Sequence, residues 1–202
     1  MDVAFSSLGL LFLAPLFVFI AVVIKIDNPG TVLFCQTRAG QEGRLFRIFK
    51  FRSMVMEAEV KGAGAFVDEN DERITWVGRI LRNTSLDEIP QLLNILSGEM
   101  SLVGPRPTLP YQVERYDIRQ RRRLAVKPGL TGWAQVNGRN DLTWPERIEL
   151  DLWYVENWSL WLDLRIIWKT LSVVASRSGL YKQVREDPIS CNPPKDKDSF
   201  SC

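Results

Sequence analysis

Residues 3–24 read VAFSSLGLLFLAPLFVFIAVVI and contain no charged residue. This stretch at the amino terminus is the most informative one about the fold. A continuous helix of this length would extend about 33 Å, close to the thickness of the hydrocarbon core of a bilayer. A cleaved signal peptide is disfavoured, because Met1-Asp2 provides no basic region and residues 25–29 contain no small-residue cleavage site. We therefore expect residues 1–27 to form a membrane helix.

Pro15 stands near the middle of this segment and leaves two topologies possible. A proline inside a helix removes one backbone hydrogen bond and bends the helix axis. The bent helix could cross the bilayer as one kinked span, since prolines are tolerated in spanning helices, or it could turn back to the side from which it entered. The residues alone do not decide between the two.

The overall composition predicts one globular domain whose chemistry does not use histidine. The chain has 202 residues, of which 46% are hydrophobic and 25% charged, and its formal net charge of +2 is too small to indicate nucleic-acid binding. It contains no histidine, the commonest general base and the usual nitrogen ligand of transition metals. Catalysis would use carboxylates and cations, and oxygen ligands would favour a hard metal ion such as Mg²⁺.

Most tryptophans lie in two predicted helices, residues 144–157 and 158–176, where they alternate with charged residues. Indole rings prefer the boundary between lipid headgroups and hydrocarbon, so these amphipathic helices are predicted to lie on a membrane surface. Burial in an ordinary core is the alternative, and for any single tryptophan it is the favoured interpretation. The sequence thus predicts a mainly α protein with a small β component: a membrane helix (1–27), a second, globular domain (28–182) and a disordered, polar tail (183–202).

An acidic pair, Asp87-Glu88, opens a predicted helix. Ser85 and Glu88 have the spacing of a capping box, which would be a purely structural role. Pro90 fits poorly into a helix capped at Ser85, and a later or irregular helix start would release Glu88 from capping. Carboxylates and phosphates are both stabilised near helix N-termini, so a nucleophile, a metal ligand and an anion site could lie together here.

A glycine- and proline-rich loop follows at residues 98–107. Gly104 would permit close approach of the backbone to a ligand, and the flanking prolines would hold Arg106 where its guanidinium can bind a phosphate. A rigid turn with a solvated arginine is the alternative.

A basic run follows, and it consists of Arg119, Arg121, Arg122 and Arg123. It could form a solvated helix face, attract anionic lipid or contact a diphosphate substrate. The first two are favoured, because each basic residue near an anionic surface contributes about 1 kcal/mol without any specific site.

Four motifs in order resemble one family, and they are KFRSM (50–54), SLDEIPQ (85–91), GEMSLVGPRP (98–107) and KPGLTG (127–132). From about Val3 to Gly179 the chain resembles the bacterial sugar transferases, which are monotopic phosphoglycosyl transferases. The resemblance implies transfer of a phosphosugar from a UDP-sugar to polyprenyl (undecaprenyl) phosphate with release of UMP. This reaction is the first membrane step of glycoconjugate assembly.

The resemblance also assigns roles to residues. Asp87 would be the nucleophile that carries a covalent phosphosugar, and Glu88 would bind Mg²⁺. Phosphate- and substrate-binding positions would be Gly104, Pro105, Arg106, Lys50, Arg82 and Arg139, while Asp151 and Asp163 are candidates for further polar contributions.

The family's helix breaks at a central proline, here Pro15, and re-enters the same leaflet. The protein would then lie in the bacterial inner membrane with its catalytic domain on the cytoplasmic face. The basic residues that usually precede this helix in the family are not present before Val3, which leaves open whether a segment precedes Met1. The sugar and the oligomeric state are not indicated.

Two rival functions remain. One is a peripheral membrane scaffold in which Asp87-Glu88 only caps a helix. The other is a glycosyltransferase that acts at the sugar carbon and releases UDP.

Overall fold

The computed structural model describes residues 2–56, 58 and 71–176. The helices of this part are α1 (Asp2–Asp27), α2 (Trp76–Asn83), α3 (Gln91–Leu96), α4 (Pro110–Glu114), α5 (Ile118–Arg121), α6 (Trp133–Val136), α7 (Trp144–Glu156) and α8 (Leu160–Ser176). Single 3-10 turns are η1 (Gln41–Gly43), η2 (Leu86–Glu88), η3 (Arg122–Ala125) and η4 (Arg139–Asp141). The strands are β1 (Leu33–Ala39), β2 (Leu45–Phe51), β3 (Ser101–Val103) and β4 (Gly129–Thr131). The predicted mainly α fold with a small β component is confirmed, while the predicted tail (183–202) lies outside the described residues.

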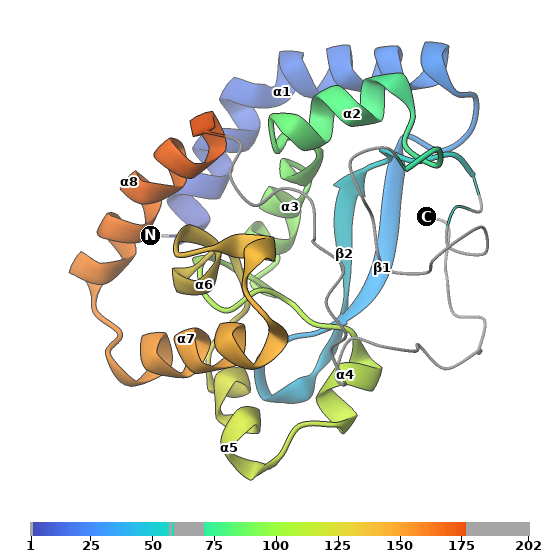
Figure 1. Cartoon of the computed structure of the whole chain (residues 1–202). Helices are drawn as coiled ribbons and strands as arrows, with labels where there is room; N and C mark the ends of the chain where they lie inside the picture. Colours follow the sequence, from blue (N-terminus) through green and yellow to red (C-terminus); the bar gives the residue numbers. More distant parts are fainter. Residues whose placement is uncertain (1, 57, 59–70, 177–202) are drawn as a thin grey trace.

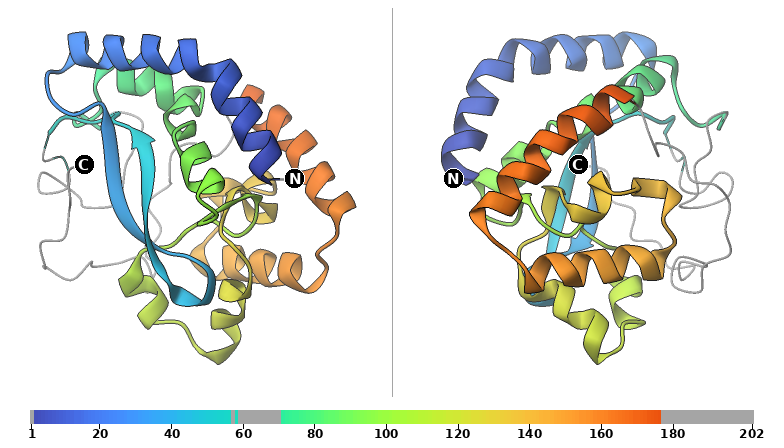
Figure 2. Two further views of the ribbon diagram at one scale, coloured as in Figure 1. Left: turned by 180° about the vertical axis from the view of Figure 1, so that it is seen from behind. Right: turned by 60° about the vertical axis from the view of Figure 1, so that its left-hand side comes forward.

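Helix α1 is continuous through Pro15 but bent, and it runs along one side of the molecule beside α2 and α3 (Figures 1 and 2). By length and composition it could cross a membrane: its most apolar 18-residue window has a mean hydropathy of 2.8, and 11% of that window is buried. The outer face of α1 is apolar and exposed, with Leu11, Phe12 and Phe19 at 69%, 77% and 64% exposure. Such a face is suited to lipid contact.

Both halves of α1 pack against the same globular body. In the first half, Leu10 and Leu13 contact a buried cluster that includes Leu92 of α3. In the second half, Ile20 and Ile24 are themselves 4% and 3% exposed, in a cluster with residues of α2 and β2. Helix α1 is therefore part of two hydrophobic cores.

The β1–β2 hairpin is fixed to α3 by one buried amide. The two strands pair in antiparallel fashion, from Leu33 opposite Phe51 to Ala39 opposite Leu45. On the outer edge of β2, the Asn94 side chain accepts a hydrogen bond from Phe49 N (3.0 Å) and donates one to Arg47 O (2.7 Å). Asn94 is 0% exposed, so it satisfies backbone groups that would otherwise be buried and unpaired. The turn that precedes α3 is thereby held beside β2.

The second sheet joins two of the sequence motifs through their glycines. Strands β3 and β4 pair in parallel, and a Cβ atom at Gly104 would lie 2.4 Å from the carbonyl oxygen of Lys127. A Cβ atom at Gly129 would lie 2.1 Å from Gly104 N. Each glycine is required because backbone packs directly against backbone.

The two tryptophan-rich helices form where they were predicted, as α7 and α8. Along α8, Leu162 and Ile166 face the core, whereas Trp161 and Trp168 are both 77% exposed. Burial of these two rings in an ordinary core, the alternative considered from sequence, is therefore wrong. Helix α8 is amphipathic, with its aromatic side chains facing outward.

Candidate active site

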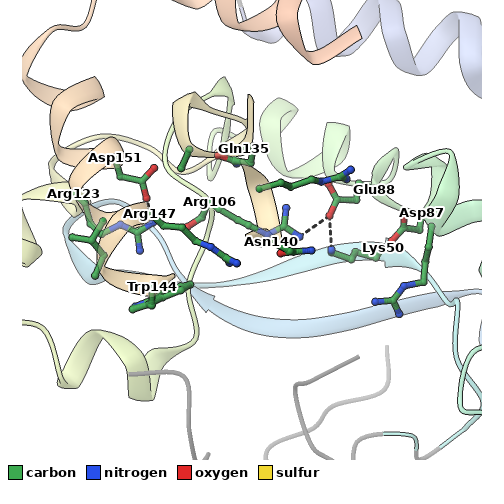
Figure 3. Close-up of a pocket in the computed structure, with 14 residues that line it drawn as sticks. Lys50, Asp87, Glu88, Arg106, Arg123, Gln135, Asn140, Trp144, Arg147 and Asp151 are labelled. Carbon is green, nitrogen blue, oxygen red and sulfur yellow. Dashed lines mark hydrogen bonds and ion pairs between the residues drawn. The ribbon is translucent and has the colours of Figure 1, made fainter. Parts of the chain in front are cut away.

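A cavity of about 110 Å³ lies between the hairpin, the acidic turn and α7 (Figure 3). Six cationic side chains and three carboxylates contribute to its wall, which is formed by Lys50, Arg82, Asp87, Glu88, Arg106, Arg123, Ala134, Gln135, Arg139, Asn140, Trp144, Arg147, Ile148 and Asp151. All six charged residues predicted for the site therefore lie around one cavity. The excess of cations is suited to an anionic ligand such as a diphosphate.

The acidic turn has an irregular start, as the position of Pro90 suggested. Ser85 has a left-handed backbone (φ 56°) and makes no side-chain capping bond, and η2 follows before α3 begins after Pro90. The Ser85 hydroxyl instead accepts a hydrogen bond from Arg139 Nη2 (3.1 Å). The capping-box interpretation of Ser85 and Glu88 is therefore wrong, and Glu88 is available to the cavity.

Glu88 is held by two cations. Its Oε1 accepts hydrogen bonds from Lys50 Nζ (2.6 Å) and Arg106 Nη2 (2.9 Å), and its side chain is 14% exposed. Burial alone would raise the pKa of Glu88, but attraction to Arg106 and Lys50 outweighs burial and holds this pKa below its usual range. Glu88 therefore stays ionised, and its Oε2 makes no hydrogen bond with any described residue.

Asp87 differs from its neighbour in both contacts and proton affinity. Its carboxylate makes no hydrogen bond or ion pair with any described residue. Burial raises the pKa of Asp87, although attraction to Lys50 opposes the change. An unattached carboxylate of raised basicity is suited to attack an electrophile, whereas Glu88 is suited to hold a cation.

Glu88 also fits a metal ion that is bound together with a substrate. Among the described residues, no group of three or more metal-ligating side chains is found. In sites of phosphoryl transfer, Mg²⁺ is usually held by one or two carboxylates together with substrate phosphates. The Oε2 atom of Glu88 can supply such a ligand, so the donor set fits an ion bound jointly with a diphosphate.

Gly104 and Pro105, the two other residues predicted from the glycine- and proline-rich loop (98–107), do not line the described part of the cavity. Gly104 packs against the segment that carries Lys127, and Pro105 O accepts a hydrogen bond from Gly129 N (2.9 Å). Both support the loop that presents Arg106. Direct contact of either residue with substrate stays a prediction.

The basic run divides into surface and buried members. Arg119 and Arg122 form exposed ion pairs with Glu149 (2.6 Å) and Glu156 (3.1 Å), as a solvated helix face would. The same interpretation is wrong for Arg123, which is 3% exposed and lines the cavity beside α7. The reason is local geometry: η3 tightens the chain after α5 and turns this one side chain inward.

Several residues of the far wall were not predicted from the sequence as site residues, namely Gln135, Asn140, Trp144 and Arg147. They come from the segment 133–147, in which the resemblance assigned a substrate-binding role to Arg139 but to none of these neighbours. Of the two further candidates, Asp151 lines the cavity. Asp163 does not; it accepts hydrogen bonds from Tyr154 Oη (2.8 Å) and Trp158 Nε1 (3.2 Å).

Within the described part of the chain, a cation-lined cavity thus holds one carboxylate that is bound by cations and one that is not, in a domain whose cores include an apolar helix. Such a site is suited to phosphorylated substrates at a membrane. The chain belongs to the bacterial sugar transferase family, which it matches over residues 1–177. This match confirms the resemblance seen in the four motifs.

Three relatives illustrate the range of the family. The uncharacterized sugar transferase EpsL of Bacillus subtilis is 48% identical over 82% of this chain and 79% of its own length. The undecaprenyl-phosphate galactose phosphotransferase of Salmonella typhimurium is 42% identical over 89% of this chain. The undecaprenyl-phosphate glucose phosphotransferase of Komagataeibacter xylinus is 46% identical over 84% of this chain. The matched region spans only 40% and 34% of the length of these two phosphotransferases.

Proposed function

We propose that this protein transfers a phosphosugar from a UDP-sugar to polyprenyl (undecaprenyl) phosphate, as a phosphoglycosyl transferase in the first membrane step of glycoconjugate assembly. The observation that carries the proposal is the division between the two carboxylates: Asp87 makes no bond to any residue that the structure describes, whereas Glu88 is held by Lys50 and Arg106. The names of the Salmonella and Komagataeibacter relatives support the polyprenyl acceptor.

In the first step, an Asp87 carboxylate oxygen attacks the phosphorus that bears the sugar. The bond between this phosphorus and the bridging oxygen breaks, and UMP leaves with the electron pair. In the second step, a phosphate oxygen of the polyprenyl phosphate attacks the same phosphorus. The bond to Asp87 breaks, which regenerates the carboxylate and releases polyprenyl-diphosphate-sugar. Carboxylate nucleophiles divide one difficult displacement into two in this way.

The cations around the cavity stabilise the charge that develops in both steps. Arg106 reaches the carboxylate pair with a side chain that is 46% exposed, so a substrate phosphate can approach its remaining donors. Lys50 lies beside Asp87 (Figure 3), and Arg82 lines the same cavity. Preorganised cations of this kind lower the energy of a charged transition state. Mg²⁺ held by Glu88 would supply further neutralisation of the diphosphate charge.

We also propose that α1 re-enters the leaflet from which it came, with the catalytic domain on the cytoplasmic face of the bacterial inner membrane. Both halves of α1 pack on one globular body. A spanning helix would carry one of its halves away from that body. The exposed Trp161 and Trp168 of α8 support an interfacial position for this helix.

The test is nucleotide release by the purified protein with undecaprenyl phosphate, Mg²⁺ and a panel of UDP-sugars that begins with UDP-galactose and UDP-glucose. We expect UMP. We also expect that, without acceptor, the protein gains the mass of one phosphosugar. Asp87→Asn should abolish both signals, while Asp141→Asn, at an exposed carboxylate outside the cavity lining, should keep them. Release of UDP would support a glycosyltransferase, and release of no nucleotide would support a scaffold.

A further inference from the structure

Arg123 is the centre of a buried network behind the phosphate-binding loop. Its Nη1 donates to Tyr116 Oη (2.6 Å), and its Nη2 donates to the main-chain carbonyl of Arg106 (3.2 Å) and to Asp151 Oδ2. The side chains of Arg123 and Asp151 are 3% and 2% exposed. Three separate segments of the chain are thus connected through one guanidinium.

Arg106 needs support of this kind. Its side chain is 46% exposed, so packing does not fix its orientation, and its known contact within the cavity is the bond to Glu88. The loop backbone is held on one side by β4, through hydrogen bonds from Gly129 N to Pro105 O and from Gly104 N to Thr131 O, each 2.9 Å. On the other side, Arg123 binds the carbonyl of Arg106 itself.

We propose that Arg123 is a positioning residue that holds the backbone of Arg106, and through it the phosphate-binding guanidinium, with Asp151 and Tyr116 as its anchors. The inference rests on the proposed function, because it assumes that Arg106 binds substrate phosphate. An arginine suits the task because its planar fork donates in several fixed directions, which the single ammonium of a lysine does not. The acidic partner is required since a buried charge must be paired.

The test is a double-mutant cycle between Tyr116→Phe and Arg106→Ala. The Phe variant keeps the packing of Tyr116 against Ile148 and Leu152 and removes only the hydroxyl that binds Arg123. We expect Tyr116→Phe alone to lower kcat/KM for the UDP-sugar about tenfold, as loss of one hydrogen bond to a charged group does. In the Arg106→Ala background the same change should have almost no effect, because the residue that it positions is gone.

A purely structural role gives a different result. Tyr116→Phe would then lower kcat/KM by the same factor in both backgrounds, or would change only the melting temperature, and either outcome would overturn the inference. Arg123→Lys, which keeps the charge but not the fork, should lower kcat/KM about 100-fold, as a displacement of about 1 Å at a reacting centre does. Arg119→Ala, in the same basic run but exposed, is the matched control and should keep wild-type values.

The affinity for UDP, measured by calorimetry, separates this inference from the proposed function. The same cycle applied to UDP affinity reports on the placement of Arg106 without any transfer reaction. A wild-type protein that binds UDP but releases no UMP would contradict the proposed transfer alone. UDP affinity that is insensitive to Tyr116→Phe and to Arg123→Lys would contradict the positioning role.

Discussion

Replacement of Glu88 by glutamine tests how strongly the cavity depends on one buried charge. The amide keeps the size of the side chain and an oxygen that can still accept from Lys50 and Arg106. What it loses is the charge of the acceptor in two short bonds, at 2.6 and 2.9 Å. It also removes the negative charge that keeps the pKa of Lys50 from falling further under burial.

The expected loss of stability follows from these two bonds. A hydrogen bond between charged partners contributes about 1 kcal/mol more than one to a neutral acceptor, so the two together account for about 2 kcal/mol. The half-exposed Arg106 contributes the smaller share, because solvent screens its charge. For a chain of this size, about 2 kcal/mol lowers the melting temperature by about 4–8 °C.

Thermal unfolding followed by tryptophan fluorescence measures this shift, and Glu149→Gln is the matched control. Glu149 pairs with Arg119 at 2.6 Å, but both side chains are more than half exposed. Surface pairs of this kind contribute at most about 1 kcal/mol, so the control should lower the melting temperature by less than the Glu88 variant does, at most about 2–4 °C. Equal shifts of the melting temperature in the two variants would refute the inference that the buried contacts of Glu88 stabilise the protein more than a surface ion pair does.

Three further predictions concern the nucleophile, the loop and the membrane helix. Turnover should rise with pH through the raised pKa of Asp87, because only the carboxylate attacks. The free energy of unfolding should fall with pH instead, because the native state binds the Asp87 proton more tightly than the unfolded chain does. Asp87 therefore destabilises the protein as the pH rises above the pKa that this carboxyl has in the unfolded chain. Asp87→Asn should therefore raise the melting temperature at neutral pH, and a lowered value would contradict the assignment. Gly104→Ala should lower the melting temperature by several degrees, about 1–3 kcal/mol, because its Cβ would meet the Lys127 carbonyl at 2.4 Å; unchanged stability would show that the two loops can separate. Tags at both ends of the wild-type chain should be accessible only from the cytoplasm, whereas Pro15→Ala, which restores a helical hydrogen bond and favours a straight axis, should expose the N-terminal tag on the far side.

Periodicity and local motifs predicted those parts of the molecule whose structure depends on neighbouring residues. The amphipathic α7 and α8 are examples, since each presents its apolar residues at helical spacing. The irregular start before α3 is another, because Pro90 cannot stand inside a helix that begins at Ser85. The charged site residues were found because they belong to ordered motifs and not because any single one is distinctive.

The far wall of the cavity could not be predicted in this way. Arg123 belongs to a run in which neighbouring arginines are exposed, and only the tertiary position of Asp151 and Tyr116 shows that this one is buried. Trp144 and Arg147 lie at the start of α7, where their sequence context is that of an ordinary capped helix. Residues that form a buried pair but lie far apart in the chain leave no local pattern in the sequence.

The packing of α1 has a consequence for any attempt to make a water-soluble form. Ile89, directly after the proposed catalytic carboxylates Asp87 and Glu88, contacts both buried clusters, and Ile20 and Ile24 of α1 belong to one of them. If α1 were only a membrane anchor, its removal would leave a domain with a complete hydrophobic core. Deletion of α1 would instead expose both hydrophobic clusters that Ile89 contacts. The shortened chain should therefore lose the ordered arrangement of Asp87 and Glu88 as well as its attachment to lipid.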